Sequence, residues 1–143
     1  MNWFALFLHQ LTDGRSEERG GSVFKGVSFV KVVIDGQELE EMDAFRDSLV
    51  YFDELARSAE SSGRYLIFTC TCGIAEDGGW EGVNVDVTES TVSWELEVGA
   101  ERLRFTFDRR EYVSEIESVK AALGSSPLPL EPRAVIFPQG FKR

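Results

Sequence analysis

The chain has 143 residues, and its 25 acidic and 15 basic residues give a formal net charge of −10. Hydrophobic residues make up 43% and aromatic residues 12% of it, which excludes a disordered chain, and the length suits one domain with its own core. Two cysteines are too few for a disulfide framework, and a charge this negative disfavours nucleic acid as a partner.

The apolar run from Trp3 to Leu11 predicts a strand covered on two faces or a short buried helix. The run is too short to cross a bilayer and lacks the basic start and cleavage site of a signal peptide, so we expect no membrane segment. Since nothing requires a disulfide, we expect a cytoplasmic protein.

The next segments predict a loop or hairpin tip and then a strand. Asp13 to Ser22 is polar and rich in glycine, whereas Val23 to Ile34 is dense in β-branched and aromatic residues. Gly26 is a candidate bulge within that strand, and Asp35-Gly36 ends it.

A change of period then predicts a helix from Asp43 to Ser61, with Gly63 as its C-terminal stop. Its apolar positions recur at spacings of three and four, which places them on one helix face; they are Phe45, Leu49, Phe52, Ala56 and Ala59.

The second half predicts a strand from Tyr65 to Cys72 that is apolar on both faces, then a glycine-rich loop from Gly73 to Gly82. Strict alternation follows in three runs, which indicates strands with one dry and one wet face in an antiparallel meander. The runs are Val83–Val87, Val92–Val98 and Leu103–Phe107.

A second helix is predicted from Asp108 to Gly124, with Asp108 as N-cap and Glu111 completing a capping box. The segment from Ser125 to Arg143 contains all four prolines and predicts an extended tail, in which Ala134 to Phe137 could dock as an edge strand.

These elements predict the α+β class. We expect a two-layer sandwich: one mostly antiparallel sheet of about five to six strands, with two helices packed on one face. Residues 1–124 would form a single domain and residues 125–143 a proline-rich tail.

Cys70 and Cys72 lie two positions apart on a predicted strand. We expect them to be small buried hydrophobic residues, and the alternative is two weak ligands of a metal. The only histidine, His9, lies far away in the chain, and a disulfide between the two cysteines is not expected because their Cα atoms would be near the limit for a bridge.

No catalytic constellation is present in the sequence. No serine or cysteine has the context of a nucleophile elbow, and 25 acidic residues make any chosen carboxylate pair uninformative. We therefore assign no catalytic residue and no cofactor, and we favour a non-enzymatic protein.

Two acidic regions are candidates for contact with a protein partner. Glu76, Asp77, Trp80 and Glu81 belong to the glycine-rich loop, where Trp80 would be the anchor; the alternative is a flexible turn. Glu40, Glu41 and Asp47 lie near the start of the first predicted helix; they would either favour its dipole or attract a basic partner.

Four motifs in order resemble a group of small bacterial proteins of unknown function over about Tyr65 to Ile116. The motifs are Thr69-Cys70-Thr71-Cys72-Gly73, Gly82-Val83-Asn84-Val85, Val92-Ser93-Trp94 and Phe105-Thr106-Phe107-Asp108. The resemblance implies a bacterial origin and a shared fold, and it carries over no catalytic residue. Members often have a further cysteine in the loop, where this chain has Ile74-Ala75-Glu76-Asp77.

The size and charge of the chain also resemble those of the immunity and accessory proteins encoded beside bacterial toxins. We therefore expect an interaction module that binds a basic protein; a homo-oligomer stays open. The alternative is a small-molecule-binding domain or enzyme with a pocket between sheet and helices, lined by Trp94, Phe105 and Phe107 rather than filled by them.

Overall fold

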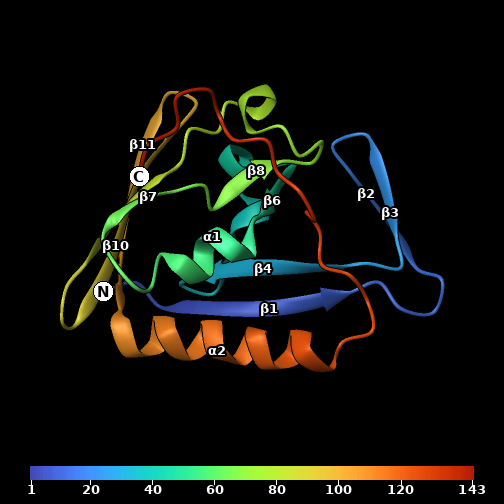
Figure 1. Ribbon diagram of the computed structural model, residues 1–143, viewed down its shortest axis with the longest axis horizontal. Helices are drawn as coiled ribbons and strands as arrows, with labels where there is room; N and C mark the ends of the chain where they lie inside the picture. The colour runs from blue at the N-terminus through green and yellow to red at the C-terminus, as the bar shows by residue number, and fades with distance from the viewer.

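The computed structural model describes residues 1–143 and shows an α+β protein with antiparallel strand pairing (Figure 1). Its strands form four small sheets, so the prediction of one sheet of five to six strands is wrong. None of the helices has the length and apolar character that a membrane crossing requires.

The elements lie as follows. One sheet has the order β1 (Phe4–Gln10), β4 (Ser28–Ile34), β5 (Gln37–Glu38), and another the order β11 (Glu101–Asp108), β10 (Thr91–Val98), β9 (Val83–Val87), β7 (Gly63–Tyr65). Two pairs complete the strands: β2 (Ser16–Arg19) with β3 (Ser22–Lys25), and β6 (Ser48–Val50) with β8 (Phe68–Cys70). The α-helices are α1 (Phe52–Arg57) and α2 (Arg109–Ser125), and the 3₁₀ turns are η1 (Leu39–Glu41), η2 (Asp43–Phe45) and η3 (Ala75–Gly78).

The predicted meander is confirmed by β9, β10 and β11. Trp94 pairs with Val85 on one side and with Phe105 on the other, so the dry face of each strand stays in register with the next. The alternation of apolar and polar residues sets this register, because a slip by one residue would expose the apolar face.

The predicted second helix is confirmed as α2, and it ends one residue beyond Gly124. The Asp108 carboxylate accepts a hydrogen bond of 3.0 Å from the Glu111 amide, as expected of the N-cap. The apolar stripe of the helix is buried at Tyr112, Ile116 and Val119.

Helix α2 lies alongside β1, the edge strand of the three-stranded sheet (Figure 1). Glu111 Oε1 accepts a hydrogen bond from the Phe4 amide at 2.7 Å, and Glu115 Oε1 accepts one from the Leu6 amide at 2.9 Å. The helix therefore satisfies outward-facing amides of an edge strand in addition to packing its apolar stripe.

The prediction of one helix from Asp43 to Ser61 is wrong on both sides of α1, and Gly63, the predicted stop, is the first residue of β7. Only Phe52–Arg57 is α-helical, because Asp47 has a left-handed backbone (φ 61°) and Ser48–Val50 pairs with β8. Phe45 and Leu49, which were predicted to share one helix face, belong to different hydrophobic clusters.

The predicted strand from Tyr65 to Cys72 is divided between two sheets. β7 pairs with β9 and β8 pairs with β6, and the chain changes sheet at Leu66 and Ile67. The expectation that this segment is buried on both faces is confirmed over Tyr65 to Thr69.

The glycine positions of the first half form turns between separate strands. Gly20 and Gly21 have positive φ and connect β2 to β3, so the tip is confined to these two residues; the rest of the predicted loop or tip includes the strand Ser16–Arg19. Gly26 (φ 65°) separates β3 from β4, which belong to different sheets, so it is not a bulge within one strand.

The residues after α2 run back across the molecule in an extended path, shown in red in Figure 1. The Ser28 amide donates to Pro129 O and the Glu131 amide to Ser28 O. Further along, Ile136 forms a single parallel bridge with Ile74, in place of the edge strand expected there.

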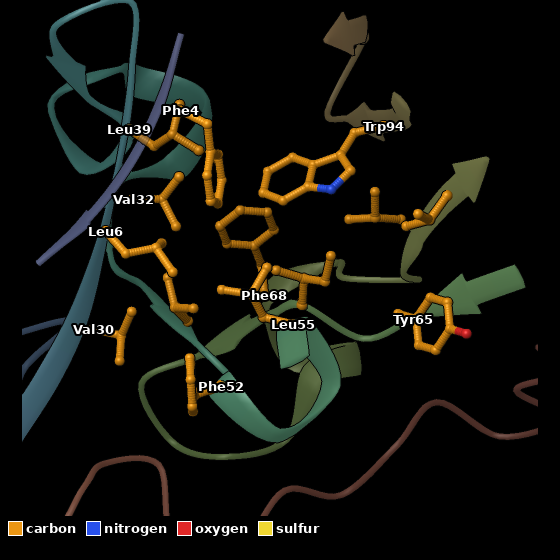
Figure 2. Packing of buried hydrophobic residues seen from close by; sticks show 14 of the residues in the cluster. Phe4, Leu6, Val30, Val32, Leu39, Phe52, Leu55, Tyr65, Phe68 and Trp94 are labelled. Carbon is orange, nitrogen blue, oxygen red and sulfur yellow. The ribbon is translucent and has the colours of Figure 1, made fainter. Parts of the chain in front are cut away.

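Twenty-five buried residues form the main hydrophobic cluster. Figure 2 shows Phe4, Phe68 and Trp94 meeting there from three segments that are distant in sequence. The ring centroid of Trp94 lies 5.9 Å from that of Phe4 and 5.8 Å from that of Phe68, both with edge-on geometry.

Candidate functional site

A polar surface depression of about 300 Å³ opens between β2, the η1–η2 segment and the start of β6. We call it the acidic depression, because five carboxylates and two arginines line it and no apolar residue does. Its lining residues are Glu17, Glu18, Arg19, Glu40, Glu41, Arg46, Asp47 and Ser48. In Figure 1 the β2–β3 hairpin that forms one wall stands apart from the main body of the protein.

Arg19 holds this hairpin against the body. Its Nη1 lies 2.8 Å from Glu40 Oε2, and its Nε lies 2.8 Å from Glu17 Oε2. The guanidinium carbon also lies 4.3 Å from the centre of the Phe29 ring, a cation–π distance. Lys31 Nζ completes the network at 2.8 Å from Glu40 Oε1, so that Glu40 joins two basic residues.

The pKa of Glu17 lies below its ordinary value. Partial burial acts to raise this pKa, but the hydrogen bond from Arg19 and the charges of Arg19, His9 and Lys31 outweigh it. Glu17 therefore keeps its negative charge in the depression to lower pH than an isolated glutamate would.

The other three carboxylates of the depression take no part in this network of ion pairs. Glu18 and Glu41 are exposed and make no ion pair, so both can contact a ligand. Asp47 Oδ1 accepts a hydrogen bond of 3.2 Å from the Gly20 amide, which fixes the hairpin tip beside the η2–β6 connection.

The structure brings the predicted residues Glu40, Glu41 and Asp47 to one surface. They do not lie at the N-terminus of an α-helix, since α1 begins at Phe52, so a favourable interaction with the dipole of that helix does not account for them. The sequence analysis missed Glu17 and Glu18, which were treated as part of a polar loop. No local signal links this segment to η1 more than 20 residues later.

The loop from Glu76 to Glu81 does not present a tryptophan to solvent, so that part of the prediction is wrong. Trp80 is only 7% exposed, and its ring centroid lies 5.5 Å from that of Phe68 and 5.9 Å from that of Phe45. Glu76 accepts a hydrogen bond from the Gln139 amide, and Glu81 is exposed. None of these loop residues lines the acidic depression.

Cys70 and Cys72 form a disulfide bond, contrary to the expectation of two unpaired thiols. The chain turns directly after β8, which brings the two Cα atoms to 5.4 Å, within the usual range for a bridge. Sulfur atoms bonded to each other are not available as thiolate ligands. The bond also removes the argument for a cytoplasmic location, which assumed that no disulfide forms.

No set of three or more His, Cys, Asp or Glu side chains is arranged to hold a metal ion. The three aromatic residues named as the alternative lining of a pocket pack in the protein interior. Trp94 and Phe107 are 0% exposed, and only Phe105 is partly accessible. Tyr112 packs among them, and burial raises the pKa of its hydroxyl well above the ordinary value.

A second, wider depression of about 740 Å³ lies between α1, α2 and the residues that follow α2. It is more apolar than the acidic depression and is lined by Tyr51, Phe52, Asp53, Glu54, Ala56, Arg57, Lys120, Leu123, Leu130, Phe137 and Arg143. It lies between the helices and the extended tail, not between sheet and helices.

Comparisons with protein-family models, with curated proteins and with solved structures found no match to this chain.

Proposed function

We propose that the chain is a non-enzymatic protein-interaction module that binds a basic protein partner through the acidic depression. The observation that carries this proposal is the concentration of five carboxylates around a concave surface that no apolar residue lines. Such a surface attracts cationic side chains over a distance and orients them on arrival. The role of an immunity-like or accessory protein belongs to the same proposal, with a basic toxin as the partner.

The arrangement of charges supports this proposal in a second way. Arg19 and Lys31 hold Glu17 and Glu40 in place, so one wall of the depression is ordered before a partner arrives. Glu18 and Glu41 are then left to pair with a partner's lysine or arginine. A preformed site lowers the conformational entropy lost on binding.

The proposal is tested with the double variant Glu18→Lys/Glu41→Lys and a short lysine- and arginine-rich peptide as the probe. The matched control is Glu89→Lys/Glu101→Lys, which changes two exposed carboxylates outside the depression and gives the same net charge. In an NMR titration, we expect the peptide to shift the amide resonances around the depression. The first variant should weaken binding by about tenfold, and the control by much less.

Raising the salt concentration should weaken peptide binding to the native chain and slow association. Equal losses of affinity in the two double variants would show that only the net charge matters, and the proposal would then be wrong. Peptide-induced shifts that are spread evenly over the surface would have the same meaning.

A small-molecule site is the second candidate, and the wider depression between α1 and α2 favours it, because six apolar residues line it. An NMR screen with apolar fragments checks this function. Shifts confined to Tyr51, Leu123 and Phe137 would support it, and their absence would exclude it.

A further inference from the structure

The Cys70–Cys72 disulfide lies where a reagent in solution can reach it. Only Thr71 separates the two cysteines, at the turn that follows β8. Cys72 is exposed, whereas Cys70 is half-buried and packs against the main hydrophobic cluster. The two sulfur atoms therefore differ in accessibility, although they belong to one bond.

The disulfide borders the acidic depression. Ser48, which lines the depression, is the strand partner of Cys70. The hairpin tip is equally close, since a Cβ atom added at Gly20 would clash with the Thr71 side chain. On the other side, Asp77 Oδ2 lies 3.7 Å from Cys72 Sγ. One carboxylate, that of Asp77, thus lies against the accessible sulfur.

We propose that this disulfide is a thiol-exchange site, that Cys72 Sγ is the atom attacked, and that the Asp77 carboxylate selects cationic aminothiols over anionic thiols. The proposal goes beyond partner binding and does not depend on it. The reductant is a thiol, and the aminothiol class carries an ammonium group beside the sulfur.

The exchange proceeds in two steps that balance. A thiolate forms a bond to Cys72 Sγ while the Cys70–Cys72 bond breaks, and Cys70 leaves as a thiolate that takes up a proton. A second thiolate attacks the external sulfur of this mixed disulfide, and Cys72 leaves and is protonated. The two reagent thiols together lose two protons and two electrons and become a disulfide, and the protein gains two thiols, at Cys70 and Cys72.

Hydrogen bonding from the backbone is similar at the two sulfur atoms. The Cys72 amide lies 3.3 Å from Cys70 Sγ and the Ile74 amide lies 3.4 Å from Cys72 Sγ, so accessibility decides between them. Attack on Cys70 would have to come through the side that packs against the core. The greater exposure of Cys72 thus favours attack on its sulfur atom.

The Asp77 carboxylate supplies the selectivity. At 3.7 Å from Cys72 Sγ it repels an incoming anion, and an ammonium group on the reagent offsets that repulsion. The effect should weaken with added salt, because the site is open to solvent.

The test measures the rate at which native, oxidised protein is reduced by cysteamine and by 2-mercaptoethanesulfonate. Each rate is divided by the rate at which the same thiol reduces a neutral small disulfide, and the quotient is the corrected rate. We expect the corrected rate for cysteamine to exceed that for the sulfonate by at least about fivefold at low salt. Asp77→Asn should narrow this ratio. Glu101→Gln, an exposed carboxylate on another sheet, should leave the ratio unchanged.

The site of attack is read from the intermediate. After an acid quench and alkylation, tandem mass spectrometry should locate the cysteamine adduct on Cys72 and the alkylated thiol on Cys70. An adduct mainly on Cys70, equal corrected rates for the two thiols, or a ratio unaffected by Asp77→Asn would overturn the proposal. So would two free thiols in protein purified without reductant, or a folded protein that neither thiol reduces.

Discussion

Tyr112 illustrates how one polar group is accommodated within the aromatic core. Its hydroxyl lies 2.6 Å from Ser58 Oγ and accepts a hydrogen bond of 3.1 Å from Trp94 Nε1. The contact joins α2 to the residue after α1 and to the centre of β10. Because the site is fully buried, the ionised form of Tyr112 is disfavoured and its pKa is raised.

This raised pKa predicts a loss of stability at alkaline pH. In the unfolded chain Tyr112 ionises near pH 10, whereas in the folded chain it keeps its proton to higher pH. The unfolded state therefore binds fewer protons above pH 10, and the free energy of unfolding falls as the pH rises beyond that point. Urea denaturation from neutral pH to about pH 11 measures this slope.

The variant Tyr112→Phe should reduce the alkaline slope of the free energy of unfolding against pH. It should also lower the free energy of unfolding at neutral pH by about 1–3 kcal/mol, since it leaves Trp94 Nε1 without its acceptor. Tyr51→Phe is the control. Burial and the charges of Asp53 and Glu54 raise the pKa of Tyr51 too, but its side chain is only half-buried, so the neutral cost should be small. An alkaline slope that is unchanged in Tyr112→Phe would contradict the assignment.

Among the elements, the β2–β3 hairpin depends most on a few charged contacts. Glu40 accepts from both Arg19 and Lys31 at 2.8 Å, and these side chains are largely shielded from solvent. Only a second, smaller hydrophobic cluster, with Phe24 packed against it, lies near the hairpin. The Arg19–Glu40 ion pair therefore joins hairpin and body beside the Phe24–Phe29 ring contact and the hydrogen bond from Gly20 to Asp47.

The variant Glu40→Gln should release the hairpin. We expect faster hydrogen exchange at the amides of β2 and β3 and a free energy of unfolding that is lower by about 1 kcal/mol. The reason is that a neutral amide at this position cannot form ion pairs with Arg19 and Lys31. The control is Glu38→Gln, because the Glu38 carboxylate lies farther from Lys31 Nζ, at 3.8 Å, and does not contact Arg19. If both variants left exchange in the hairpin unchanged, Glu40 would not hold it.

The predicted elements differ in outcome for a physical reason. The strands β9 to β11 and the helix α2 were correctly predicted, because their alternation, their turns and the Asp108 cap act between residues close in sequence. The helix expected from Asp43 failed because the backbone of Ser48–Val50 finds its partners in β8, about twenty residues later. The spacing of apolar residues in the sequence does not distinguish a helix from the short strand that forms at Ser48–Val50.

Across the molecule, the last residue of the chain closes over a buried carboxylate. Glu54 is only 2% exposed; its Oε1 accepts from Arg143 Nη1 at 2.7 Å and from the Leu66 amide at 3.1 Å. The hydrogen bond to Glu54 raises the pKa of Arg143. The contact connects α1, the change of sheet at Leu66 and the end of the tail.

The variant Arg143→Ala should destabilise the protein by about 1–3 kcal/mol, because Glu54 would stay buried with less compensation. Partial exposure of Arg143 keeps the effect below that of a fully buried pair. Urea denaturation of Arg143→Ala, Glu54→Gln and the double variant measures the coupling. Arg133→Ala is the control, since Arg133 is largely exposed and its ion pair with Glu131 does not involve Glu54. Additive effects at Glu54 and Arg143 would argue against coupling.

The amino-acid order determined the α+β class, the meander and the capped helix, because period-two and period-3.6 patterns and a cap depend on neighbouring residues. Contacts between distant segments decided three other features: four small sheets instead of one, the burial of Trp80, and the meeting of Glu17 and Glu18 with Glu40, Glu41 and Asp47. The strong negative charge of the chain became a local acidic depression only when the β2–β3 hairpin folded against η1. The Cys70–Cys72 bond required a turn that strand spacing does not predict.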